Sequence, residues 1–293
     1  MNWLTQLADI VHHLEKRWQL ITSQPLDGGS ESIVLPAQRS DGSQAILKIG
    51  MPGVSNIPNE AAILRLADGR GYVKLFNVDR EHNAMLIERL GTPLAHAGKP
   101  LTQQIEIICQ TLQTAWRPLD NPHGLMAGAE KARWLAAFID KLWHELDAPC
   151  SKATKDQAIA YAEARESAHD PANCVLVHGD AHALNTLQAR SPNDDSPLYK
   201  FVDPDGLFAE PACDLAVPMR GFSAELLQGD AVQLGLARCE QLAALTGVEQ
   251  TAIWQWGFME RVSTGLLLWK IGRRDLGVDM LHVADLWGRA PHF

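Results

Sequence analysis

The chain has 293 residues, 46% of them hydrophobic, and can therefore bury a substantial core in one large domain or two smaller ones. Its net charge of −9 argues against a nucleic-acid partner, because binding to a phosphate backbone needs clustered lysine and arginine. Five scattered cysteines without a C-x-x-C pair, no signal peptide and no ~20-residue apolar run predict a cytoplasmic protein that does not enter a membrane. We expect a monomer or a weak homodimer.

The first predicted element is an amphipathic helix over residues 2–18, where apolar side chains recur every three or four positions. Strands are expected over residues 20–26 and 33–37, with the turn Gly28-Gly29-Ser30 between them. Glycines in such a turn let backbone amides approach phosphate oxygens closely. An ordinary hairpin needs the same turn, so the pattern alone leaves both interpretations open.

A single lysine, Lys48, lies inside the apolar run 45–49, which predicts a strand. Burying an unpaired ammonium group costs several kcal/mol, so this lysine needs a carboxylate partner. Glu60, in a helix-forming segment that follows Pro58, is available. The alternative is an edge-strand lysine in water and a first-turn glutamate favoured by the helix dipole.

The pattern changes from strand to helix after Glu88. Strands are expected over residues 73–78 and 84–87, and a connector that includes Leu90 follows them. Periodic apolar positions predict helices over residues 102–116, 128–147, 152–168, 215–227, 232–245, 251–269 and 277–289.

The stretch that carries most chemistry lies between these groups of helices. One short apolar run ends at His178-Gly179-Asp180, Asn185 follows, and a second run, 199–202, ends at Asp203. A solvated loop over residues 191–197 is expected to connect the two strands as a hairpin. Oxygen-bearing side chains at strand ends suit Mg²⁺ binding, and D-x-x-x-x-N with a later aspartate is a pattern of phosphoryl-transfer enzymes.

This H-G-D-x-x-x-x-N element, with the downstream aspartate, resembles the catalytic and metal loops of the aminoglycoside phosphotransferases, which are distant relatives of the protein kinases. The run from Asp203 to Ala216 is similar to that of the streptomycin 6-kinase and hydroxyurea-resistance branch. The resemblance implies an α+β, protein-kinase-like bilobal fold. It implies a small antiparallel β-sheet N-lobe over residues 1–90 and a larger, mainly helical C-lobe over residues 91–293.

The resemblance also implies the reaction and the residues that carry it. The γ-phosphoryl group of ATP would move, with Mg²⁺, to a hydroxyl of a small, cationic molecule, an aminoglycoside such as streptomycin. Asp180 would orient that hydroxyl and accept its proton, and Asn185 and Asp203 would hold the metal. The nucleotide-binding residues would be Lys48, Glu60, Gly28, Gly29, Ser30, Glu88 and Leu90. Asp214 is expected to brace the catalytic loop, and His178 to bond to backbone.

Acidic residues near the second strand are the candidates for binding ammonium groups of the acceptor. Asp205 and Glu210 lie closest in the sequence, and Glu260, Asp275 and Asp279 follow in the C-terminal helices. The streptomycin-kinase branch often has a lysine at the position of Asp205. This departure puts the identity of the acceptor in doubt.

Other interpretations of the same residues stay open. Kinases of fructosamine, choline or homoserine share the core motifs. His178, Asp180 and His182 spell H-x-D-x-H, which could hold a transition metal in a hydrolase. Asp180 could also simply cap a turn. A nucleotide-binding protein without transfer activity is the last alternative.

Overall fold

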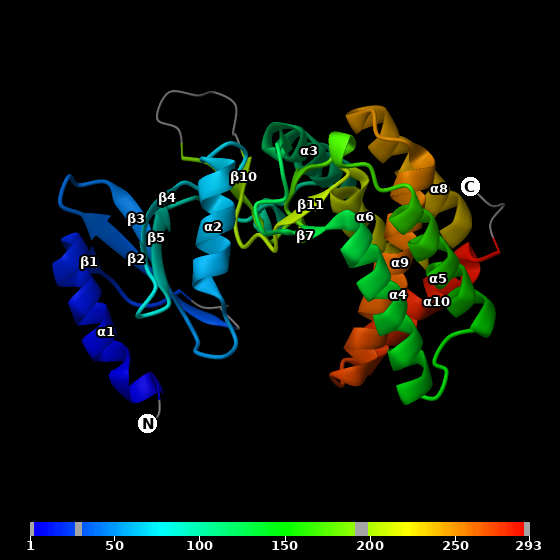
Figure 1. Ribbon diagram of the computed structural model, residues 1–293, viewed down its shortest axis with the longest axis horizontal. Helices are drawn as coiled ribbons and strands as arrows, with labels where there is room; N and C mark the ends of the chain where they lie inside the picture. The colour runs from blue at the N-terminus through cyan, green and yellow to red at the C-terminus, as the bar shows by residue number, and fades with distance from the viewer. Residues whose placement is uncertain (1–2, 27–30, 191–198, 290–293) are drawn as a thin grey trace. The chain divides into compact units, whose positions relative to one another are not determined.

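The computed structural model describes residues 3–26, 31–190 and 199–289. The chain folds into two compact units (Figure 1). The first contains Met1–Ala97 together with Leu184–Asp205, and the second contains Gly98–Ala183 together with Gly206–Phe293. The division into lobes at residue 90 stays a prediction. A segment from the second half of the chain thus belongs to the first unit.

The first unit is built on a five-stranded antiparallel sheet with the order β1-β2-β3-β5-β4. The strands are β1 (Leu20–Thr22), β2 (Ser32–Arg39), β3 (Gln44–Gly50), β4 (Leu75–Asp79) and β5 (Ala84–Glu88). The prediction of a strand over residues 20–26 was too long, because the regular ladder with β2 ends at Thr22, and beyond it only single backbone bonds, from Ser23 N–H to Pro36 O and from Leu26 N–H to Val34 O, continue the pairing. Lys48 lies in the centre of the sheet, opposite Val34 of β2 and Met85 of β5.

Helices α1 (Trp3–Trp18) and α2 (Ile57–Ala67) cover opposite faces of this sheet (Figure 1). The buried Leu14 of α1 packs into a core with Leu47 and Ile49 of β3. Side chains alternate between the two faces of a strand, so Lys48 points away from α1 and toward α2. Glu60 lies in the first turn of α2, where the Asn56 side chain caps the helix.

The segment 184–205 contributes a short hairpin, β9 (Thr186–Gln188) and β10 (Tyr199–Phe201). Backbone bonds tie it to the rest of the unit, including Val73 N–H to Phe201 O at 2.8 Å and Gly91 N–H to Gln188 O at 2.7 Å. The expectation that residues 199–202 pair with the strand before His178 was wrong, because β10 pairs with β9. The predicted loop 191–197 lies outside the described residues.

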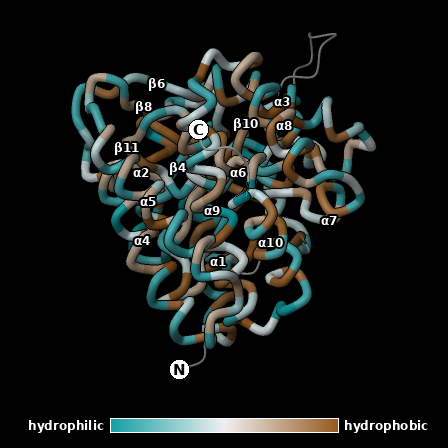
Figure 2. Tube along the Cα trace, turned by 90° about the vertical axis from the view of Figure 1, so that its right-hand side faces the viewer, coloured by the Kyte–Doolittle hydropathy of each residue, from teal (hydrophilic) through white to brown (hydrophobic). Residues whose placement is uncertain are grey.

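Eight helices of the second unit are described. They are α3 (Leu101–Ala115), α4 (Gly128–Glu145), α5 (Lys152–Ser167), α6 (Ala212–Arg220), α7 (Ser223–Leu226), α8 (Ala231–Thr246), α9 (Gln250–Lys270) and α10 (Arg274–Trp287). Helix α9 contacts α4, α5, α6, α8 and α10, and Figure 2 shows it between α4 and α10. Its residues from Ala252 to Ser263 are all buried, so α9 forms the centre of this unit.

The predicted helix over residues 215–227 is two helices. Helix α6 ends at Arg220, Gly221 is extended, and Phe222 has a left-handed φ of 61° before α7 begins. The apolar periodicity continues through this break, which is why it was missed. The break leaves Arg220 at a helix end. None of the described helices combines the length and apolar composition needed to cross a bilayer.

A four-stranded sheet in the second unit presents the predicted catalytic loop, which follows His178. Its order is β6-β8-β11-β7, with β6 (Arg117–Pro118), β7 (Met126–Ala127), β8 (Val175–Val177) and β11 (Leu207–Ala209). Strand β8 ends just before His178, whose carbonyl accepts a hydrogen bond of 3.0 Å from Gly206 N–H. The loop that begins with Gly179 is therefore anchored at its start.

Replacing Leu14 by alanine tests the packing of α1. We expect Leu14→Ala to lower the free energy of unfolding by about 2–4 kcal/mol, because the cavity would lie between the helix and the sheet. Chemical denaturation measures the change. Leu4→Ala is the control on the same helix, since Leu4 is 60% exposed and its loss should cost less than about 0.5 kcal/mol. Equal effects of the two changes would contradict the packing.

Candidate active site

Lys48 is the centre of a three-residue charge cluster in the first unit. Its Nζ lies 2.7 Å from Glu60 Oε2 and 2.6 Å from Asp203 Oδ1. The side chains of Lys48 and Glu60 are almost buried, whereas that of Asp203 is 53% exposed. The ion pair that the sequence predicted between Lys48 and Glu60 is therefore present, and Asp203 joins it.

Burial and charge act in opposite directions on this cluster. Burial disfavours the charged form of Lys48, but Glu60 and Asp203 outweigh it and raise the pKa of the ammonium group. Burial raises the pKa of Glu60 to about 7, against the opposing charge of Lys48, and the nearby charge of Asp203 adds to the rise. Two carboxylates thus compete for one cation.

The backbone brings Asn185 and Asp203 into register. Val202 N–H donates a 2.9 Å hydrogen bond to the carbonyl of Asn185, so Asp203 directly follows the residue that is bonded to Asn185. Asp203 has a left-handed φ of 56°, a conformation that aspartate tolerates better than most residues and that often occurs at functional sites. Carboxylate and amide oxygens are the hard donors that Mg²⁺ prefers.

A cavity of about 560 Å³ in the first unit includes Lys48 and Asp203 in its lining, together with the predicted Glu88 and Leu90. The remaining wall is largely apolar and includes Val34, Ile46, Ile87, Leu187 and Val202. A slot with apolar walls and a charged end suits a ligand with one flat and one ionic part. The predicted residues Gly28, Gly29 and Ser30 lie outside the described residues.

The side chain of Glu88 is committed to protein contacts. Its Oε2 accepts hydrogen bonds from Lys200 Nζ at 2.7 Å and from Lys74 N–H at 3.1 Å. The backbone N–H of Glu88 also donates to Lys74 O, at 2.8 Å, so the backbone beyond β5, at Leu90, is what this segment could offer a ligand. The sequence did not indicate the role of Lys200, because its partner lies 112 positions away.

A buried carboxylate organises the predicted catalytic loop of the second unit. Asp214, in the first turn of α6, accepts hydrogen bonds from His178 N–H at 2.9 Å, Gly179 N–H at 2.7 Å and Trp116 Nε1–H at 3.0 Å. Burial raises the pKa of Asp214 to about 6, although these three donors favour its ionised form. The bracing role predicted for Asp214 agrees with these contacts. Gly179 adopts a φ of 86°, which favours glycine at this turn.

His178 faces the backbone, as predicted. Its Nδ1 accepts a 3.1 Å hydrogen bond from Asp180 N–H, and the side chain is buried. In the described part of the chain, His178, Asp180 and His182 do not bring three ligand atoms together in the way that a metal site requires. The hydrolase alternative therefore has no geometric support.

The predicted base, Asp180, is held by two basic side chains. Arg220 Nη2 lies 2.5 Å from its Oδ1, and His182 Nε2 lies 3.3 Å from its Oδ2. Burial would raise the pKa of Asp180, but the hydrogen bond from His182 and the charge of Arg220 hold it well below its usual range. Arg220 also contacts Glu260 at 3.1 Å, and Glu260 in turn contacts Lys131 at 3.3 Å.

Comparison with known proteins shows the family. A family model described as aminoglycoside/hydroxyurea antibiotic resistance kinase matches residues 17–269. The chain belongs to this family. It is 27% identical over 289 residues to streptomycin 6-kinase of Streptomyces glaucescens, a match that covers 94% of this chain and 87% of that protein. It is 30% identical over 258 residues to hydroxyurea phosphotransferase of Kitasatospora aureofaciens, covering 82% and 70%.

The fold of this resistance kinase is shared with more distant enzymes. The crystal structure of macrolide 2′-phosphotransferase from Brachybacterium faecium matches with a TM-score of 0.60 at 16% identity, covering 93% of this chain and 97% of that one. The prediction of an α+β, protein-kinase-like fold is confirmed, as is the prediction that the protein is a phosphotransferase.

The kinase's predicted acceptor-binding acids differ in their surroundings. Asp205 is exposed. Glu210 is paired with Arg165 at 3.3 Å and accepts a 2.8 Å hydrogen bond from Trp256 Nε1–H. Their role toward an acceptor stays a prediction. Arg220 was not predicted, although an arginine that directly follows the apolar run of α6 could have indicated a buried cation.

Replacing Asp214 by asparagine tests the anchor of the catalytic loop. The asparagine keeps one carbonyl oxygen but turns an NH₂ group toward backbone N–H donors. We expect Asp214→Asn to cost about 2–4 kcal/mol in the free energy of unfolding and to reduce turnover, because the loop before Asp180 loses its anchor. Denaturation and steady-state kinetics measure both. Asp120→Asn is the control, because the side chain of Asp120 is exposed. If Asp214→Asn had the stability and turnover of the wild type, Asp214 would not anchor the loop.

Proposed function

We propose that the protein transfers the γ-phosphoryl group of ATP to a hydroxyl of a small molecule, foremost an aminoglycoside such as streptomycin. The observation that carries the proposal is the Lys48 cluster at the charged end of an apolar cavity in a member of a kinase family. Phosphoryl transfer asks a protein chiefly for alignment and neutralisation of charge. A buried lysine held by carboxylates supplies a fixed positive charge.

In this proposal the apolar walls of the cavity hold the adenine, and Lys48 neutralises the α- and β-phosphates. Glu60 keeps the ammonium group in place. The hard oxygen donors Asn185 and Asp203 fit Mg²⁺. When bound, Mg²⁺ would neutralise phosphate charge. Asp203 has the exposure that a metal ligand needs, and Lys48 occupies only its Oδ1.

Asp180 orients the acceptor hydroxyl and accepts its proton as the new bond to phosphorus forms. The low pKa of Asp180 keeps it ionised, so that it is ready to accept a hydrogen bond. An acceptor hydroxyl that approaches Asp180 would displace Arg220 or His182 where it competes with them for a carboxylate oxygen. His182 is the more exposed of these, at 37% against 19% for Arg220, and is the partner that we expect to leave.

Charge near Asp180 bears on the choice of acceptor. Glu260 is shared by Arg220 and Lys131, and Lys131 lies over the exposed Trp134 ring at 5.0 Å from its centroid. The guanidinium group of an aminoglycoside such as streptomycin could take the place of Lys131 between Glu260 and Trp134. The relative in Streptomyces glaucescens supports this acceptor class.

Hydroxyurea is the second candidate acceptor. Arg220 places a fixed positive charge beside Asp180, which would repel a polycation and leave an uncharged acceptor unaffected. The relative named hydroxyurea phosphotransferase supports this alternative. Hydroxyurea carries the hydroxyl that the reaction needs. Fructosamine, choline and homoserine remain further acceptors to test.

A coupled assay of ADP release tests the function directly. The protein, ATP and Mg²⁺ are combined in turn with streptomycin, other aminoglycosides, hydroxyurea, fructosamine, choline and homoserine. We expect acceptor-dependent turnover that falls roughly 10²- to 10⁴-fold in Asp180→Asn, with ATP binding retained. Equal turnover in both proteins would refute the role of Asp180. If hydroxyurea were the only acceptor that supports turnover, hydroxyurea and not an aminoglycoside would be the substrate.

Replacing Arg220 by methionine tests its effect on the base. Without the guanidinium group, the pKa of Asp180 rises toward its ordinary value. The acid limb of the kcat/KM profile should therefore move to higher pH. The ion pair between Arg220 and Asp180 also stabilises the folded wild type at pH values above the ordinary carboxyl pKa. This stabilisation is lost as the pH falls through the lowered pKa of Asp180.

Arg165→Met is the matched control for this change. Arg165 is a partly buried arginine that pairs with Glu210 instead of Asp180. It should lose stability without moving the acid limb. An Arg220→Met variant with the same pH profile as the wild type would show that Arg220 does not govern the protonation of the base.

A further inference from the structure

A second group of possible ligands lies on the α1 side of the first unit's sheet. His13 comes from α1, Asp79 ends β4, and His82 lies in the turn between β4 and β5. Lys48 points to the opposite face of the same sheet, so this group takes no part in the proposed phosphoryl transfer. Among the residues that the structure describes, these three side chains bring one ligand atom each to within 4.8 Å of one another.

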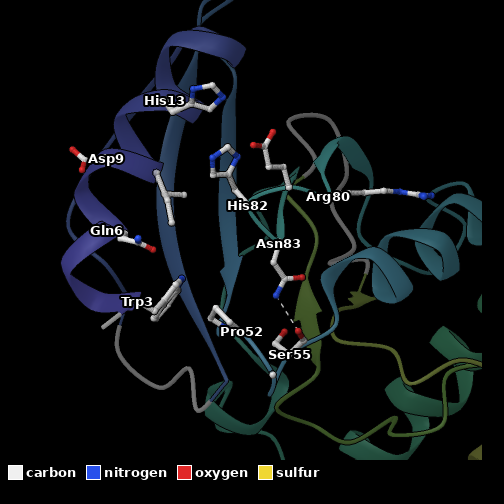
Figure 3. Close-up of a pocket in the computed structure, with 12 residues that line it drawn as sticks. Trp3, Gln6, Asp9, His13, Pro52, Ser55, Arg80, His82 and Asn83 are labelled. Carbon is white, nitrogen blue, oxygen red and sulfur yellow. Dashed lines mark hydrogen bonds between the residues drawn. The ribbon is translucent and has the colours of Figure 1, made fainter. Parts of the chain in front are cut away.

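The two imidazole rings face each other between the helix and the turn. Their centroids are 4.8 Å apart and their planes are inclined by 34°. Figure 3 shows His13 on α1 and His82 on the turn at the same end of a cavity. His13 is exposed, so a change of its side-chain torsions can shorten the distance to the other ligands.

The ring nitrogen of His82 that faces inward lacks a hydrogen-bond partner. Nδ1 is buried and lies 3.3 Å from Asp79 Oδ1, outside the orientation of a hydrogen bond, and none of the described residues offers another partner. A buried polar nitrogen without a partner costs free energy. A ligand that binds this nitrogen would remove that cost.

Asp79 supplies the anionic ligand of the group. Its side chain is buried, and its Oδ1 accepts a 3.0 Å hydrogen bond from His82 N–H, so carboxylate and imidazole are held by the same short turn. Arg17, one helical turn after His13, contacts Oδ2. Its side chain is 51% exposed, so an incoming metal ion can displace it and take over the neutralisation of the buried carboxylate. The Arg17 guanidinium group thus occupies the position beside Asp79 that a metal ion would take.

The cavity beside the two histidines has a volume of about 840 Å³ and continues to Trp3 and Pro52 at its other end (Figure 3). It leaves room for water molecules in the remaining coordination positions of a bound ion. Two imidazoles and one carboxylate favour Zn²⁺ and its neighbours Co²⁺ and Ni²⁺ over Mg²⁺, which prefers oxygen ligands alone.

We propose that His13, Asp79 and His82 form a binding site for a transition-metal ion of the Zn²⁺ class. The ion would link α1 to the turn between β4 and β5 and would be distinct from the Mg²⁺ of the phosphoryl-transfer reaction. The proposal does not rest on the proposed function.

Binding of Zn²⁺ and Co²⁺ to the full-length protein, prepared without a polyhistidine tag, tests the site. We expect saturable one-to-one binding by calorimetry, visible absorption bands of Co²⁺ with nitrogen ligands, and a higher melting temperature with Zn²⁺. His13→Gln should weaken binding at least about tenfold and abolish the Co²⁺ bands. His13 is exposed, so this variant should fold normally without metal.

His12→Gln is the matched control, because His12 is the preceding residue of the same helix, is also exposed and does not belong to the group. It should bind both ions as the wild type does. Asp79→Asn keeps an acceptor for His82 N–H but removes the charge, and should also weaken binding. Equal effects of His12→Gln and His13→Gln, or Zn²⁺ binding that His13→Gln leaves unchanged, would overturn the proposal.

Discussion

The ammonium group of Lys48 determines how the first unit is assembled. It contacts a carboxylate from α2 and another that follows β10, so three segments far apart in the sequence depend on one buried charge. Lys48 is almost buried, so its ammonium group needs a carboxylate beside it, and Asp203 supplies one of the two that it contacts. This requirement helps to explain why Leu184–Asp205 belongs with the first 97 residues. It also leaves two carboxylates for one cation, and a second cation beside Asp203 would complete the balance.

Two aspartates of the second unit show how surroundings separate structural from chemical roles. Asp214 is fully buried and receives three N–H donors, all from the protein, which leaves it no access to a substrate. Asp180 is partly exposed, and its partners are side chains that a substrate can replace. The first carboxylate fixes the backbone of the loop, and the second has the exposure that the proposed proton transfer requires. The same residue type thus serves two roles at one loop, because only one of the two carboxylates has a side open to a ligand.

Sequence patterns predicted the features that depend on neighbouring residues. Helices α1, α4 and α9 followed from periodic apolar positions, and the pair Lys48–Glu60 followed from a lysine placed in an apolar strand. The same patterns misjudged the break after Arg220, because Gly221 and Phe222 interrupt a helix whose apolar periodicity continues. They also could not choose the partner of β10, since strand pairing depends on the whole sheet and not on the loop that joins two runs.

The contacts of Arg220 could not be read from the sequence, although its burial could. The reasoning that identified Lys48 applies equally to a guanidinium group that follows the apolar residues of α6, since it too needs carboxylate partners. What the sequence does not reveal is the identity of those partners, because Asp180 and Glu260 each lie 40 positions from Arg220, in opposite directions along the chain. Only the packing of α6 against α9 and against the catalytic loop selects them. The sequence can therefore predict that a buried charge needs a partner of opposite charge, while the tertiary structure determines which residues are those partners.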